Sequence, residues 1–319
     1  FQGRDAIIVV PQKAATGNPW IWRPAFFDAF PAVDKALLER GFHVVYLDVT
    51  NDYASPWAIE LGNRFYKEMV ENYGLSSKVV MEGFSRGGLY SIVWASRNPD
   101  NVACLYLDAP LSDVFTCLKR LHKAAWKTLL KEWNLTEETI DRFDGNPIDN
   151  LEPLAKAGVS IISVCGDNDR SVPIEENMMV IRKRYLALGG NVELIIKPGC
   201  DHHPHSLEDP QPVVDFIMRQ QPEYKKYQHY TIRGSLHNSF IKFERERRGR
   251  VAFIGGSITE MVGWKDMMEQ QLQQRFPFTA FEFVEAGISS TGSTPGAFRL
   301  DNDVLSKGCL LYTSDAADE

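Results

Sequence analysis

The sequence predicts an α/β protein built around a mostly parallel sheet, and three features of one long stretch agree on this. Short runs of β-branched and other apolar residues alternate with amphipathic segments along residues 6–219. The apolar runs are continuous rather than alternating with polar residues, which is typical of strands that are buried on both faces. The segments between them are long enough to supply the crossover helices that join parallel strands.

The elements of this first domain, residues 1–220, can be read in chain order. The expected strands are 6–10, 43–48, 78–82, 102–108, 160–164 and 192–197. The expected helices are 25–40, 55–73, 86–98, 174–188 and 212–220. Residues 111–150 break this alternation, since they have a helical pattern with Trp126 and Trp133. We expect them to form a helical cap over the carboxyl ends of the strands, where open α/β sheets bind ligands.

A second α/β pattern follows a basic segment. Residues 221–250 are rich in Lys and Arg, and we expect a solvated linker or hairpin there rather than a patch for an acidic partner. A strand, a helix and a strand are expected at 251–254, 264–275 and 281–284. They form a second domain of residues 251–308. Residues 309–319 resemble the translation of a sequencing adapter, so we exclude them from the fold, and the start at Phe1 leads us to expect upstream sequence.

Composition excludes several classes of function. The chain has 319 residues, of which 44% are hydrophobic and 24% charged, enough for about two domains with full cores. A formal net charge of -7 argues against a general nucleic-acid binder. No apolar run approaches the roughly 18 residues that a membrane span needs. The 5 cysteines lie far apart without C-x-x-C pairs, so neither a disulfide framework nor a zinc site is indicated.

Gly83-Phe84-Ser85-Arg86-Gly87-Gly88 directly follows the strand at 78–82 and directly precedes a helix. A serine between a strand and a helix sits on a strained turn, and glycines two positions to either side avoid clashes with the neighbouring elements. The turn projects the Ser85 hydroxyl above the sheet. The helix N-terminus, with the backbone N–H of Arg86 first, then faces a developing oxyanion.

A serine nucleophile needs a base and an orienting acid, and both follow from later strands. The loop after 160–164 carries Asp167 and Asp169, and the loop after 192–197 carries a group of histidines. A serine, an acid and a histidine, in this order at the ends of successive strands, is the arrangement of α/β-hydrolases.

Residues 6–219 therefore resemble an α/β-hydrolase, in the neighbourhood of esterases and prolyl-oligopeptidase-like hydrolases. The resemblance implies that Ser85 is the nucleophile, Asp169 the acid of a G-x-x-D-x-x-V-P pattern, and His202 the base. Asp167 is the alternative acid, although it fits better as a turn residue.

The choice among the histidines stays open, because His203 and His205 lie beside His202 and can line the pocket. A zinc site formed by these three histidines and Asp201 is the competing interpretation of this cluster. The resemblance to a serine hydrolase, by contrast, implies no metal and no cofactor.

The second oxyanion donor is expected from the loop that follows the strand at 6–10, where Lys13 or Gln12 offers its backbone N–H. That loop continues through Trp20, Trp22 and Arg23. They are expected either to form a substrate-binding wall, with an indole stacked on a sugar and the guanidinium paired with a carboxylate, or to pin the loop to the core.

A second serine turn opens the second domain. Gly255-Gly256-Ser257-Ile258-Thr259 resembles the first block of SGNH or GDSL-type hydrolases, which have a flavodoxin-like sheet, although Gly256 stands where the family has Asp. Residues 286–293 resemble the second block, which implies Ser257 as nucleophile and Ser290 in an oxyanion hole. The family's remaining blocks would follow residue 308, so this half is expected to be inactive as given. The alternative is an unrelated Gly-rich turn, such as a phosphate-binding loop.

These patterns together predict a two-module serine hydrolase that forms an acyl-Ser85 intermediate. Pairing with an SGNH module resembles bacterial carbohydrate esterases, which implies a secreted or periplasmic enzyme. Its substrate is then a small-molecule or polysaccharide ester, an acetylated glycan above all. A prolyl-oligopeptidase-like peptidase and a non-catalytic glycan-binding module are the alternatives.

Overall fold

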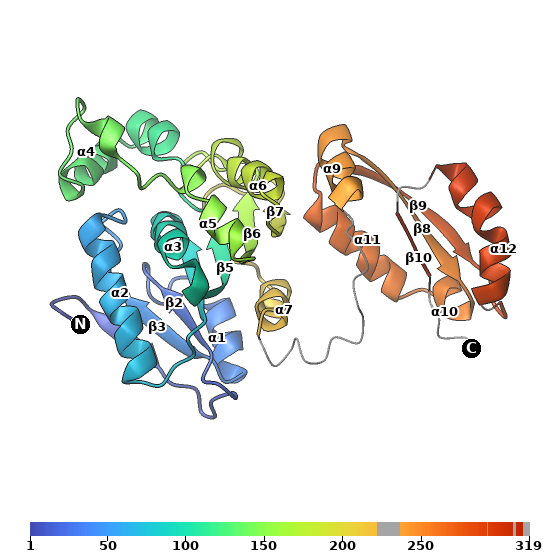
Figure 1. Cartoon of the computed structure of the whole chain (residues 1–319), viewed down its shortest axis with the longest axis horizontal. Helices are drawn as coiled ribbons and strands as arrows, with labels where there is room; N and C mark the ends of the chain where they lie inside the picture. Colours follow the sequence, from blue (N-terminus) through green and yellow to red (C-terminus); the bar gives the residue numbers. More distant parts are fainter. Residues whose placement is uncertain (222–236, 292, 309–310, 315–319) are drawn as a thin grey trace. The chain divides into compact units, whose positions relative to one another are not determined.

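The computed structural model describes residues 1–221, 237–291, 293–308 and 311–314. The chain divides into two compact units, Phe1–Gln228 and His229–Glu319, and each is described by itself (Figure 1). Among the described helices, none combines the length and the apolar character that crossing a bilayer requires.

A 7-stranded sheet forms the centre of the first unit, with the order β1-β3-β2-β4-β5-β6-β7. Its strands are β1 (Ala6–Val9), β2 (Trp20–Arg23), β3 (His43–Leu47), β4 (Val79–Phe84), β5 (Val102–Asp108), β6 (Ser160–Gly166) and β7 (Val192–Lys197). All neighbours pair in parallel except β1, which is antiparallel to β3. The predicted α/β class with a mostly parallel sheet is confirmed.

Helices cover both faces of this sheet, which explains why its strands are apolar throughout (Figure 1). They are α1 (Ala32–Glu39), α2 (Pro56–Glu71), α3 (Arg86–Arg97), α5 (Glu152–Lys156), α6 (Met178–Ala187) and α7 (Gln211–Arg219). Trp22, Phe65 and Trp94 belong to the core between the sheet and α2 and α3, whereas Phe84 and Phe216 belong to the core on the side of α1 and α7. The sheet therefore holds its strand ends in a fixed frame.

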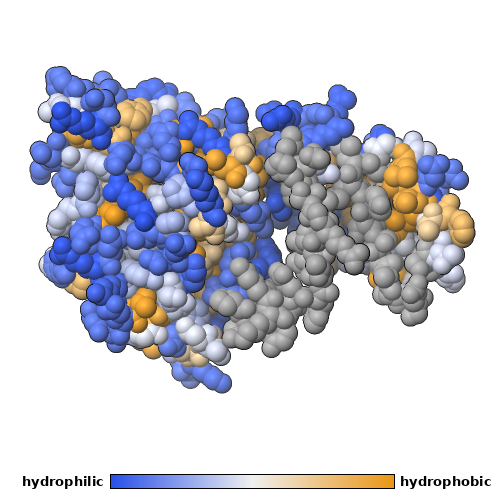
Figure 2. Space-filling view, in the orientation of Figure 1, coloured by the Kyte–Doolittle hydropathy of each residue, from blue (hydrophilic) through white to orange (hydrophobic). Residues whose placement is uncertain are grey.

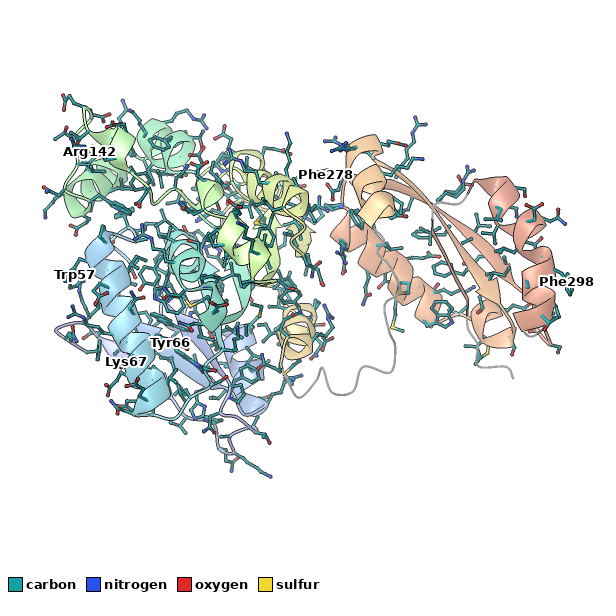
Figure 3. The ribbon with its side chains drawn as sticks, viewed as in Figure 1. Trp57, Tyr66, Lys67, Arg142, Phe278 and Phe298 are labelled. Atoms are coloured by element: carbon teal, nitrogen blue, oxygen red, sulfur yellow. The ribbon has the colours of Figure 1, made fainter. Side chains whose placement is uncertain are left out.

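Helix α2 shows how the sequence determines where a helix begins and which of its sides is buried. It begins after Ser55, whose hydroxyl accepts the N–H of Ala58 at 3.4 Å, and Pro56 occupies its first turn. Trp57 is 52% exposed on its outer side, whereas the ring of Tyr66 packs on Trp20 (Figure 3). Elsewhere on the face of the first unit that Figure 2 shows, the surface is largely hydrophilic with scattered apolar residues.

Two expectations for the start of the chain were wrong. The segment expected to be a loop contains β2, which lies between β3 and β4 and so occupies the interior of the sheet. The helix expected at 25–40 begins only at Ala32, because Phe26, Asp28 and Phe30 have positive φ and Pro31 directly precedes the helix. Left-handed backbone at several positions is incompatible with a continuing right-handed helix.

The segment expected to be a cap follows β5 and contains the π-helix η2 (Phe115–Lys119) and α4 (Lys123–Glu132). Trp133 is buried, and its indole N–H donates to the carbonyl of Tyr53 at 2.9 Å. His122 Nε2 lies 2.9 Å from the carbonyl oxygen of Ser171. Because Tyr53 and Ser171 follow the carboxyl ends of β3 and β6, the segment packs on loops at that edge of the sheet.

The second unit has a 3-stranded parallel sheet with the order β10-β8-β9. Its elements are α9 (His237–Glu246), β8 (Arg248–Gly255), α10 (Ser257–Glu260), α11 (Trp264–Arg275), β9 (Ala280–Gly287), α12 (Ser293–Asp303), η6 (Leu305–Lys307) and β10 (Leu311–Ser314). Phe243, Phe253 and Phe276 form the centre of its small core. Phe298 on α12 is 82% exposed (Figure 3).

The expectation of a linker at 221–250 was wrong for the part of this range that the structure describes. Residues 222–236 lie outside the described residues, but α9 and the start of β8 belong to the second unit, because Phe243 is fully buried in its core. In the expected adapter-derived tail, only 311–314 are described, as β10 paired with β8. That pairing does not test the origin of the tail, which stays a prediction.

Candidate active site

Ser85 sits on a strained turn between β4 and α3. Its φ of 50° and ψ of -117° lie in a region that residues with a side chain rarely adopt. Backbone hydrogen bonds fix the turn: the N–H of Ser85 donates to the carbonyl of Asp108 at 2.9 Å, and its carbonyl accepts from Gly88 and Leu111, each at 2.9 Å. The hydroxyl is thereby held above the carboxyl edge of the sheet.

The glycines around the turn are required to different degrees. A Cβ on Gly83 would lie 2.6 Å from the Cα of Gly88, and one on Gly88 would lie 2.5 Å from the Cβ of Pro110. A Cβ on Gly87 would meet the Cβ of Ala25 at 3.1 Å. The closest approach therefore involves Gly83 and Gly88, and the importance of Gly88 was not apparent from the G-x-S-x-G spacing.

Ser85, His202 and Asp169 come together from three loops. His202 Nε2 lies 3.0 Å from the Oγ of Ser85, and His202 Nδ1 lies 2.7 Å from Oδ2 of Asp169. Asp169 is buried, and its Oδ1 accepts the N–H groups of Ser171 at 2.9 Å and Val172 at 2.8 Å. With Nδ1–H donated to the carboxylate, Nε2 carries a lone pair that faces the serine hydroxyl.

Two other aspartates on these loops accept hydrogen bonds from backbone N–H groups. Asp167 Oδ1 accepts the N–H of Gly199 at 2.6 Å, which agrees with its interpretation as a turn residue. Asp201 takes two hydrogen bonds from the Arg170 side chain, at 2.9 and 2.6 Å, and one from the backbone N–H of His202 at 2.8 Å. Hydrogen bonds from Arg170 and from His202 hold the pKa of Asp201 below its usual range.

His205 forms a second imidazole–carboxylate pair beneath this site. Its Nδ1 lies 2.6 Å from Oδ1 of Asp108, whose other oxygen accepts the N–H of Ser206 at 2.7 Å. The ring is 7% exposed and stacks on Phe84 with 5.2 Å between centroids. It therefore supports the strand end before Ser85.

His203 lies on the solvent side of the same loop, where its ring stacks on Phe30 at 6.1 Å. Partial burial, and then the neighbouring rings of His205 and His202, lower the pKa of His203. Among the described residues, these three histidines form a group that could hold a metal ion. One potential ligand atom from each lies within 4.8 Å of those of the other two. Asp201 is not part of that group.

Arg86, expected to donate its backbone N–H to an oxyanion, is the first residue of α3. The first N–H groups of a helix have no partner within it, and the oxyanion role of Arg86 stays a prediction. The Arg86 side chain instead donates to Oδ1 of Asn51 at 2.8 Å and to the hydroxyl of Tyr53 at 3.2 Å.

Lys13 lies at the opposite edge of the sheet, so its assignment to the oxyanion hole was wrong. Because β1 is antiparallel, the loop after it leaves at the amino ends of the other strands. A Cβ on Gly41, just before β3, would lie 2.8 Å from the carbonyl oxygen of Lys13. The loop after β2 occupies the correct edge, with Ala25 beside Gly87 at the start of α3. The apolar run Trp20-Ile21-Trp22 was the signal for that strand.

The expected substrate wall is also corrected. Trp20 and Trp22 are 0% exposed and Arg23 is 1% exposed, because they form β2 in the interior of the sheet. The tryptophans therefore pack the core, which was the alternative expectation. Arg23 contacts Asp34, and its Nε lies 3.6 Å from Glu82, whose pKa burial raises well above the usual value. None of these side chains reaches solvent to bind a substrate.

In the second unit, Ser257 begins α10 directly after β8 and is partly buried. Ser290, with a φ of 61°, follows β9. The two loops touch, since the N–H of Ser289 donates to the Glu260 carboxylate at 2.7 Å. No histidine is among the described side chains of this unit.

Comparison with known proteins supports the assignment of the first unit. A model of the prolyl oligopeptidase family matches residues 64–221, which include Ser85, Asp169 and His202. No curated protein matches the chain closely enough to count as a relative.

Solved structures resemble the chain at low identity. Dipeptidyl peptidase 4 of Porphyromonas gingivalis has a TM-score of 0.51 and 14% identity, over 67% of this chain and 33% of that one. Acylaminoacyl peptidase of Pyrococcus horikoshii has a TM-score of 0.56 and 14% identity, over 72% and 41%. A truncated carbohydrate esterase from gut microbiota has a TM-score of 0.53 and 17% identity, over 68% and 90%.

The chain thus spans well under half the length of the two peptidases and most of the length of the esterase fragment. At this identity the likeness concerns the fold, which is that of the α/β-hydrolases. The fold likeness, the family match over residues 64–221 and the contact from Ser85 through His202 to Asp169 all agree with a serine hydrolase.

Proposed function

We propose that the first unit hydrolyses carboxylic esters through an acyl-enzyme on Ser85. The contact of Ser85 Oγ with His202 Nε2, at 3.0 Å, carries this proposal. His202 takes the hydroxyl proton as the oxygen attacks the ester carbonyl, and the buried carboxylate of Asp169 stabilises the imidazolium that results. The tetrahedral oxyanion accepts the N–H of Arg86 and a second N–H from Ala25 or Phe26, on the loop after β2.

The intermediate collapses when the carbon–alkoxide bond breaks and His202 returns its proton to the departing alcohol. A water molecule then attacks the acyl carbonyl while His202 accepts one of its protons. The carboxylic acid leaves, and Ser85 regains its proton from His202. The cycle requires one base on the open face of the serine, and His202 is the imidazole in contact with it.

An acetylated carbohydrate is the substrate class that we favour. The support is the likeness to the truncated carbohydrate esterase, of which the chain covers 90%. This remains an analogy of fold, because the same fold serves many chemistries. A peptidase is the second candidate, and the match of residues 64–221 to the prolyl oligopeptidase family favours it.

Two substrates separate these candidates, with Ser85→Ala as the control in each case. An esterase turns over p-nitrophenyl acetate and releases acetate from an acetylated xylo-oligosaccharide, and both activities disappear in Ser85→Ala. Ser85-dependent release of p-nitroaniline from a prolyl anilide, without release of acetate from the glycan, would establish the peptidase instead. Glycan binding without Ser85-dependent turnover would leave only a binding module.

For the second unit, we propose an SGNH-type fold in which no histidine among the described side chains serves Ser257 as a base. Its support is the position of Ser257 after β8 and of Ser290 after β9, on loops that touch through Glu260 and Ser289. A fluorophosphonate probe should therefore leave Ser257 unlabelled in a Ser85→Ala protein. Labelling of Ser257 would mean that another base activates it.

A further inference from the structure

Three imidazoles lie close together beside the Ser85 turn. The ring centroids of His202, His203 and His205 lie 5.0, 4.9 and 4.8 Å apart, and the ring planes are inclined at 73° to 85° to one another. One nitrogen from each ring lies within 4.8 Å of the other two. The reaction proposed above uses only His202, so two of these imidazoles have no role in it.

Two of the rings are fixed by buried carboxylates. Asp169 holds Nδ1 of His202 at 2.7 Å, and Asp108 holds Nδ1 of His205 at 2.6 Å. Both carboxylates are almost completely buried, at 6% and 1% exposure. Histidines that ligate metals are held in this way, because a carboxylate on one nitrogen orients the ring and makes the other nitrogen a better donor.

His203 supplies the third imidazole from the solvent side. It is exposed, and its ring lies beside that of Phe30 with 6.1 Å between centroids. An ion arriving from solvent would meet His203 first and then the two carboxylate-fixed rings.

The dimensions suit a small tetrahedral ion. With Zn–N bonds of about 2.0–2.1 Å, ligating nitrogens lie about 3.4 Å apart and ring centroids about 5 Å apart. The observed centroid separations of 4.8 to 5.0 Å already meet the second condition. Rotation of the rings must bring the nitrogens closer, and His203 is the ring that solvent leaves free to turn.

We propose that His202, His203 and His205 bind one divalent transition-metal ion, such as Zn²⁺, and that the bound ion switches the hydrolase off. Binding at Nε2 of His202 occupies the lone pair that accepts the proton of Ser85, so the serine loses its base. Inhibition rests on the proposed function, whereas binding of the ion does not.

Binding is measured first, with Co²⁺ as a coloured substitute for Zn²⁺ and with the full chain freed of any histidine tag. Visible absorption of tetrahedral Co²⁺ is followed during titration of wild type, His203→Gln and His122→Gln. His122 is exposed and lies outside the cluster, so the same substitution there is the matched control. Wild type and His122→Gln should bind one ion per chain, and His203→Gln should bind at least about tenfold more weakly.

Hydrolysis of p-nitrophenyl acetate is then measured against Zn²⁺ concentration, each variant relative to its own metal-free rate. His203→Gln should need at least about tenfold more Zn²⁺ for half inhibition than wild type, with activity restored by EDTA. Equal Co²⁺ affinity in wild type and His203→Gln, or no binding by wild type, would overturn the proposal. If the ion binds through His203 but no ester is hydrolysed, the site stands and the proposed function fails.

Discussion

Replacing Asp169 by Asn should abolish most of the turnover while leaving the fold intact. The amide oxygen of Asn can still accept the N–H groups of Ser171 and Val172, which bond to Oδ1 at 2.9 and 2.8 Å. Its NH₂ group, however, then faces Nδ1 of His202, where Oδ2 of Asp169 accepts a hydrogen bond at 2.7 Å. Nδ1 must then accept a hydrogen bond from this NH₂ group, so the ring proton moves to Nε2. A protonated Nε2 has no free lone pair and can no longer accept the proton of Ser85.

The expected loss is about 10⁴-fold in kcat, as for the equivalent change in other Ser–His–Asp enzymes, or about 5 kcal/mol of transition-state stabilisation. The assay is hydrolysis of p-nitrophenyl acetate, with thermal unfolding to show that the variant is folded. Asp167→Asn is the control, because Asp167 only accepts the N–H of Gly199, and an amide oxygen can do the same. A folded Asp169→Asn protein that keeps more than about a tenth of the activity would refute the assignment of the acid.

Three further predictions test the surroundings of the site. Gly88→Ala should lower the free energy of unfolding by roughly 1–3 kcal/mol, because the new Cβ would lie 2.5 Å from the Cβ of Pro110, and an unchanged urea midpoint would contradict this. Trp22→Ala should lower the free energy of unfolding by about 3–5 kcal/mol, because the indole packs in the core. A changed KM with unchanged stability would show instead that Trp22 binds the substrate. The hydrogen bonds that Asp201 accepts from the backbone and side chain of Arg170 and from the N–H of His202 hold its folded pKa below the unfolded value of about 3.9. They stabilise the fold above that pH, and this stabilisation is lost as the pH falls from there through the folded pKa. The difference in Tm between wild type and Asp201→Asn should therefore shrink below about pH 4, and a constant difference would contradict this role of Asp201.

The serine turn could be predicted from the sequence because its requirements are local. The strand, the glycines and the helix that shape Ser85 are contiguous, so one short stretch contains the whole signal. Asp169 and His202 are far away along the chain, yet each follows the end of a parallel strand, and such ends meet at one edge of the sheet. Their proximity to Ser85 therefore followed from topology.

The errors in the predicted fold and site arose where the pairing of strands far apart in the sequence determines the structure. Strand β2 is only 4 residues long, and Arg23 at its end is polar, so the segment read as a loop. The direction of β1 depends on its partner β3, and nothing within residues 6–9 specifies it. With that direction reversed, Lys13 was placed at the wrong edge of the sheet. The pairing of Arg23 with Glu82 and Asp34 was equally out of reach, since buried ion pairs have no periodic signature in sequence.

The most direct test of the central claim is covalent labelling of the native protein with a fluorophosphonate, followed by intact-mass and peptide analysis. Wild type should gain one adduct, located on Ser85, and His202→Gln should label far more slowly because the hydroxyl has lost its base. Ser85→Ala should gain none. An unlabelled wild type, or a Ser85→Ala protein that labels as readily as wild type, would show that this turn does not hold the nucleophile.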